Sequence, residues 1–145
     1  MSAALDIALY SKMTGDTIAG GVNHATTGAT GGFHNGAAPQ GAGFPRVHFQ
    51  ELVKTREYSF AALSHEHGFY QISAFAVDGN SEGITTAKTL AERIETLLTD
   101  PSMSVTGKTL LQCRPDRMNP MQYERDDVND RFIYSQSLIL EVWLA

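Results

Sequence analysis

Residues 132–144 carry the feature that most restricts the fold of this chain, an alternation of side chains with a period of two. One face of this segment presents Phe132, Tyr134, Leu138, Leu140, Val142 and Leu144, and the other presents Ile133, Ser135, Ser137, Ile139, Glu141 and Trp143. Alternation over this length is typical of a strand that lays one face against a core. The chain is therefore expected to build a sheet, with other segments supplying paired strands and a covering layer.

Four further segments carry strand patterns, at 45–53, 67–77, 105–114 and 121–127, with turns expected at 114–119 and 129–130. Segment 67–77 is apolar on both faces, which predicts a central place in the sheet. Helices are expected at 3–13 and at 81–98, the second capped by Ser81 and stopped at Asp100-Pro101. Their apolar stripes are Leu5, Ala8, Leu9 and Met13 in the first, and Ile84, Ala87, Leu90, Ala91, Ile94, Leu97 and Leu98 in the second. We expect an α+β fold, a mostly antiparallel sheet of about five strands with two helices packed on one face.

Segment 17–45 differs in composition from the rest of the chain, because it contains no Asp, Glu, Lys or Arg. Nine of the 13 glycines lie between Gly15 and Gly43. Large apolar side chains are scarce here, so the segment is expected to form a long loop or arm, either docked on a partner or mobile. In 23–36, Phe33 is the only Phe, Tyr or Trp and is the natural anchor of a docked arm, with His34 beside it. Deletion of the arm is expected to leave a folded monomer that fails to assemble.

The length and charge of the chain exclude several classes of protein. The 145 residues fit one domain, 1–145, and 42% of them are hydrophobic, which suits a packed core. The formal net charge is −5, which argues against wrapping DNA on a broad basic face. No apolar run approaches the roughly 20 residues that cross a bilayer, and the N-terminus does not resemble a secretion signal.

A search for chemistry finds weak signals. His65 and His67 fall on one side of an extended chain, the spacing of a metal site, and a third ligand could come from His48, His24 or His34. The more ordinary interpretation is a pair of exposed or hydrogen-bonded histidines. The single cysteine, Cys113, is expected to be a small buried apolar residue rather than a nucleophile. We therefore expect no catalytic residue, no metal and no cofactor.

Charged side chains gather between residues 114 and 131. We expect them in the turns between the last three strands, where they form either a solvated tip or a mixed-charge contact surface. The members that we take as candidate interface residues are Arg114, Arg117, Arg125, Asp126, Asp127 and Arg131, together with Phe33 and His34 of the arm. Trp143 is expected to cover either the core or a subunit interface.

The order of several segments is familiar. A short helix and a Gly-rich loop lead into APQGAGFPRVHFQEL (38–52), followed by Tyr58, the strand YQISAFA (70–76), the helix TAKTLAERIETLL (86–98) and a closing LEVW (140–143). This arrangement resembles the tail-completion, or tail-terminator, family of long-tailed (siphovirus-type) bacteriophages and related gene-transfer particles. The likeness covers nearly the whole chain.

The resemblance implies a structural virion protein rather than an enzyme. Such proteins form a ring, usually hexameric, that caps the tail tube, ends its polymerisation and joins the tail to the head connector. The implied partners are further copies of the chain, the tail tube protein and a head connector, adaptor or stopper protein. The implied location is the head–tail junction of the virion, after synthesis in the cytoplasm of the bacterial host, with no membrane contact.

DNA would pass through the lumen of such a ring without sequence-specific binding. Six copies at −5 would total about −30, and a lumen without net positive charge does not hold phosphates. Three alternatives remain open. They are another head–tail neck or adaptor protein, a small metal-dependent hydrolase that uses His65 and His67, and a stand-alone ligand-binding domain.

Overall fold

The structure is a computed structural model that describes residues 3–59, 62–78 and 83–145. Along the chain the elements are α1 (Ala3–Thr14), β1 (Phe33–Asn35), β2 (Arg46–Ser59), β3 (Ala62–Val77), α2 (Gly83–Leu97), β4 (Leu110–Met118), β5 (Gln122–Asp126) and β6 (Arg131–Leu144). The predicted cap Ser81 lies outside the described residues. The expected α+β class is confirmed, and the described residues form six strands where about five were expected.

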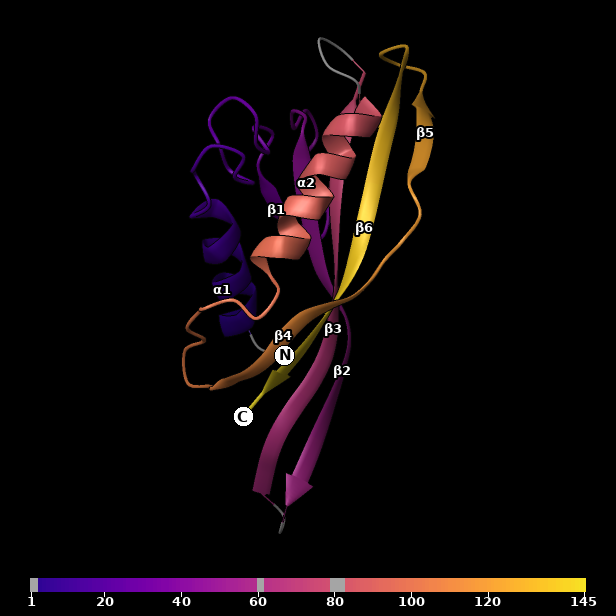
Figure 1. Cartoon of the computed structure of the whole chain (residues 1–145). Coiled ribbons are helices and arrows are strands. Elements are labelled where there is room, and N and C mark those ends of the chain that lie inside the picture. Colours follow the sequence, from indigo (N-terminus) through magenta and orange to yellow (C-terminus); the bar gives the residue numbers. More distant parts are fainter. Residues whose placement is uncertain (1–2, 60–61, 79–82) are drawn as a thin grey trace.

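The strands form one sheet in the order β1-β2-β3-β6-β4, with β5 also paired to β6. All pairs are antiparallel except β1, which runs parallel to β2. Strands β4 and β5 share the same edge of β6, because β4 pairs with residues 138–144 and β5 with residues 131–135. The predicted central position of segment 67–77 is confirmed, since β3 lies between β2 and β6. Strands β2 and β3 form a hairpin much longer than predicted, which projects from the lower end of the sheet in Figure 1.

Both helices lie on the same side of the sheet (Figure 1), and their apolar stripes meet the alternating strand residues. Leu5, Leu9 and Met13 of α1 are fully buried, as the stripe predicted. The buried strand residues that face the helices include Val47, Phe49, Tyr70, Ile72, Leu138, Leu140, Val142 and Leu144. The stripe of α2 is correct through Leu90 and Ile94 and wrong at Ile84, whose side chain is about half exposed. The two faces of residues 138–144 therefore divide as the alternation predicted.

Segment 17–45 corrects the expectation of a loop without core residues. Val22, Ala29 and Phe33 belong to the hydrophobic core, and β1 adds a strand to the sheet edge. The small side chains allow backbone to approach backbone, because the amide of Gly31 donates to the carbonyl of Pro45 at 2.7 Å. A few buried apolar groups and many turn hydrogen bonds thus fold this segment onto the domain. Deleting 23–43 would remove β1 and Phe33 from the core, so we now expect the deletion to destabilise the monomer rather than leave it folded.

Residues 105–118 also differ from the prediction. Val105–Lys108 is a tight turn closed by an isolated bridge, with Gly107 at a φ of 76°, and the strand begins only at Leu110. The strand then continues through Pro115 to Met118, where a turn was expected. Proline is tolerated because β4 is an edge strand with a bulge between Pro115 and Arg117. No helix among the described residues is long and apolar enough to cross a membrane.

Candidate interaction surface

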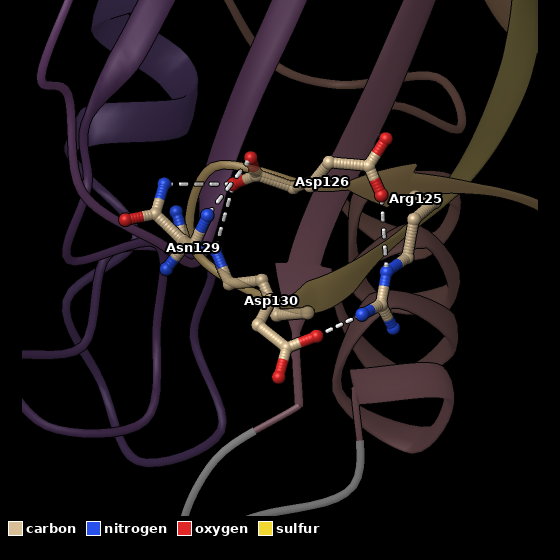
Figure 2. Close-up of polar contacts among 6 residues, drawn as sticks. Arg125, Asp126, Asn129 and Asp130 are labelled. Atoms are coloured by element: carbon tan, nitrogen blue, oxygen red, sulfur yellow. Dashed lines mark hydrogen bonds and ion pairs between the residues drawn. The ribbon is translucent and has the colours of Figure 1, made fainter.

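Four of the eight candidate interface residues lie in or directly beside the turn between β5 and β6, namely Arg125, Asp126, Asp127 and Arg131. Figure 2 shows Arg125, Asp126, Asn129 and Asp130 at this turn. Arg125 pairs with Asp130, and its Nε lies 3.4 Å from Oδ1 of Asp127. Asp126 accepts from Nδ2 of Asn129 at 2.9 Å and from Nε of Arg131 at 3.1 Å. Asp130 sits at a φ of 50°, a left-handed turn conformation that aspartate tolerates. The turn is therefore braced by its own charges rather than loosely solvated.

Two large side chains with apolar surface are exposed in and beside this turn. Val128 is 93% exposed and Tyr123, on β5, is 71% exposed. The guanidinium of Arg125 lies 5.1 Å from the ring centroid of Phe132, within the range of a cation–π contact. Hydrogen bonds from Asn129 and then Arg131 lower the pKa of Asp126, so its carboxylate stays charged in mildly acidic solution.

Arg114 and Arg117 lie apart from this turn. Both belong to β4, where register places Arg114 opposite Glu141 and Arg117 opposite Ile139. Their side chains are exposed along the sheet edge. The predicted charged surface is thus divided into a braced turn and a separate strand edge.

The two candidate residues of the arm, Phe33 and His34, also differ in their surroundings. Phe33 is 9% exposed and packs in the core of its own chain, so it is not presented as an anchor for a partner. His34 is half-buried, with Nε2 3.0 Å from the carbonyl oxygen of Gly31 and its ring edge-on to His48 at 5.7 Å. Sequence reasoning chose Phe33 because it is a lone aromatic, and its packing against β2 could not be foreseen without the strand register.

A cationic and aromatic corner joins the arm to the start of β2. The guanidinium of Arg46 lies 4.1 Å from the ring centroid of Phe44, and that of Arg131 lies 5.1 Å from the same ring. Burial and the neighbouring Arg131 lower the pKa of Arg46. Burial, followed by the charge of Arg46, lowers the pKa of His48 to about 4, so this imidazole is neutral at neutral pH. Arg131 therefore links the braced turn to the arm.

The paired histidines both contact the same aromatic ring. The His67 ring stacks on Trp143 with centroids 3.9 Å apart, and His65 lies 5.3 Å from the same indole. Nε2 of His67 and Nε1 of Trp143 both lie 2.9 Å from Oε1 of Glu141. Within the described part of the chain, no three His, Cys, Asp or Glu side chains form a group that could hold a metal ion. The hydrolase alternative therefore has no third ligand among these residues.

The cysteine behaves as the sequence suggested. Cys113 is 1% exposed, and burial raises the pKa of its thiol to about 12. The thiol is therefore protonated at neutral pH and is a poor nucleophile.

The sheet face opposite the helices carries a stripe of uncharged polar side chains that sequence reasoning did not single out. Ser73 and Ser137 share a hydrogen bond of 2.7 Å across β3 and β6, and Nε2 of Gln71 lies 3.4 Å from each hydroxyl. A shallow depression of about 240 Å³ lies over this stripe and reaches Gln122 and Tyr123. The period-two pattern places these polar side chains on one face of each strand, but only the register of β3 with β6 shows that they lie next to one another.

Two solved structures have folds similar to that of this chain. One chain of the virion of a native gene transfer agent particle aligns with a TM-score of 0.69 and 16% identity, over 98% of this chain and 95% of that chain. A second solved structure, whose description states no function, aligns with a TM-score of 0.51 and 16% identity, over 97% of this chain and 91% of that one. No protein-family model matches the chain, and no curated protein matches it. At this identity the likeness defines the fold.

Proposed function

We propose that this protein is a structural component of a phage-like virion that forms a ring, hexameric in our proposal, at the end of the tail tube. The ring ends tail polymerisation and presents a docking surface to the head connector, adaptor or stopper protein. The observation that carries the proposal is the near full-length fold match to a chain of a gene transfer agent virion. The order of sequence segments that resembles tail terminators supports the same role.

The surface of the chain suits an assembly of many copies. Strand β2 is covered by β1 only as far as Phe49, and its residues 50–56 are exposed along the sheet edge. Exposed edges of this kind pair readily with other chains, and a ring covers them. The net charge of −5 per copy is compatible with a lumen through which DNA moves without being held.

The test is electron microscopy of lysates made with and without the gene. We expect its absence to give filled heads beside separate tails of uncontrolled length, and purified protein to restore joined particles. Separate heads with tails of normal length would move the protein to the head side of the joint, as a neck or adaptor protein. Intact particles in its absence would contradict both structural roles.

A further inference from the structure

Two exposed surfaces of this chain are complementary in charge and lie at opposite ends of the molecule. The turn end consists of residues 123–131, between β5 and β6. The hairpin end consists of residues 51–56 of β2 with Glu66 of β3 and Lys108. Figure 1 shows the β5–β6 turn at the top of the view and the β2–β3 hairpin at the bottom.

The turn end is acidic. It carries the four carboxylates Glu124, Asp126, Asp127 and Asp130 against the two guanidinium groups of Arg125 and Arg131, an excess of two negative charges. The side chains of Asp127 and Asp130 are 89% and 86% exposed even though both pair with Arg125. Val128, which lies between these two aspartates in the sequence, is exposed, so the turn presents an apolar side chain next to acidic ones.

The described side chains of the hairpin end have the opposite charge. Nε of Arg56 and Nζ of Lys108 lie 3.6 and 3.8 Å from the same carboxylate oxygen of Glu66, so two cations share one buried anion. With Lys54 and Glu51, the described side chains of this surface carry an excess of one positive charge, and Glu57, the next residue of β2, has a side chain outside the described part. Leu52 and Val53 are 46% and 52% exposed beside these cations. The surface therefore offers apolar area with cations around it.

We propose that the turn end of one copy docks on the hairpin end of the next copy. The two surfaces match in charge, acidic against basic, and in their exposed apolar side chains. They cannot meet within one chain, because they lie at opposite ends of it. A contact between two different surfaces of identical copies is head-to-tail and closes into a ring when the rotation allows. This inference rests on the proposed ring and names its subunit interface.

Charge reversal on each side tests the contact. The hairpin variant combines Lys54→Glu with Arg56→Glu, and the turn variant combines Glu124→Lys with Asp127→Lys. The turn variant removes the Arg125–Asp127 contact but keeps the Arg125–Asp130 and Asp126–Arg131 pairs. The readout is the number of joined particles after each purified chain is added to a lysate that lacks the gene. We expect each variant to lower that number at least about tenfold, because like charges then face each other.

The chain that combines all four substitutions should recover to within about threefold of the natural chain, since its surfaces are again opposite in charge. An equal mixture of the two reversed chains gives a second route to recovery, because in a ring with an even number of copies each reversed surface can face the other. Lys88→Glu with Glu92→Lys, on the exposed side of α2, is the matched control and should act as the natural chain does. Circular dichroism and thermal melting establish that every variant is folded.

The outcomes separate this contact from the ring itself. Natural yields from both reversed variants would overturn the interface, and so would failure of both the four-substitution chain and the mixture to recover. In either case the natural chain would still join particles, and the proposed function would stand. If the natural chain itself joined none, the proposed function would fail.

Discussion

At the scale of single residues, Asp16 connects three parts of the chain. Its carboxylate accepts hydrogen bonds from Nε and a terminal nitrogen of Arg93, at 2.8 and 2.7 Å. It also accepts one from the backbone amide of Val22 at 2.8 Å. These contacts tie the end of α1 and the start of segment 17–45 to α2. The pKa of Asp16 is lowered, chiefly by the hydrogen bond from Arg93, although burial acts in the opposite direction.

Asp16→Asn should therefore lower the free energy of unfolding by about 2 kcal/mol at neutral pH, because it leaves Arg93 without its charged partner. The folded pKa lies below the ordinary value of 3.8, so the charged form stabilises the fold above that pH and the contribution is lost as pH falls through the folded pKa. Urea denaturation at neutral pH and near pH 3 measures both effects. The exposed Asp127→Asn should cost under about 1 kcal/mol. Equal losses for the two variants would contradict this account.

Trp143 is the only tryptophan of the chain, so its emission reports on one place. Its ring stacks on His67 with centroids 3.9 Å apart, so this imidazole covers one face of the indole. We expect His67→Ala, which uncovers that face to water, to shift the emission to longer wavelength, and His65→Ala, whose ring lies 5.3 Å away, to shift it less. Equal shifts for the two variants, or none for His67→Ala, would contradict the stacked arrangement.

At the scale of elements, segment 17–45 is the part of the fold that depends most on close backbone contact. A Cβ added at Gly31 would lie 2.1 Å from the carbonyl oxygen of Gly43, whereas a Cβ at Gly43 would lie 3.7 Å from the Cα of Gly31. The two glycines therefore face each other but differ in their tolerance of a side chain. This asymmetry shows how a segment with few large apolar groups can still be packed.

Gly31→Ala should lower the free energy of unfolding by about 2 kcal/mol through this overlap, and Gly43→Ala should cost far less. Urea denaturation gives the two values, and limited proteolysis shows whether cleavage rises within 17–45. Equal stability of both variants would mean that the segment does not lie against the sheet as described.

The sequence predicted elements with strong periodicity and failed where contacts are distant. The alternation over 138–144 and most of the two helix stripes were sufficient, since each pattern reports its own burial, but Ile84 is about half exposed and residues 132–137 are half-buried on both faces. Pro115 was taken as a turn because a single sequence does not show that β4 is an edge strand. The cluster of His67, Glu141 and Trp143 and the burial of Phe33 depend on strand register, which no local pattern contains. The braced turn was predicted by composition, but its ion pairs were not.

At the scale of the whole molecule, the sheet is asymmetric. One face is covered by α1 and α2, and the other carries the polar stripe of Gln71, Ser73 and Ser137 beside the stacked Trp143. A charged turn and an exposed strand edge lie at opposite ends of this sheet (Figure 1). A chain built in this way presents different surfaces in different directions, which is compatible with the proposed ring between a tube and a connector.

The most direct test of the ring at the tail end is the position of the protein in finished particles. Ala145 is exposed, so a C-terminal tag can be labelled with gold on tails whose heads have been detached. The account predicts label only at the head-proximal end of the tube, and six-fold averaged density for a ring there. Label along the tube, on the head or nowhere on the particle would contradict it.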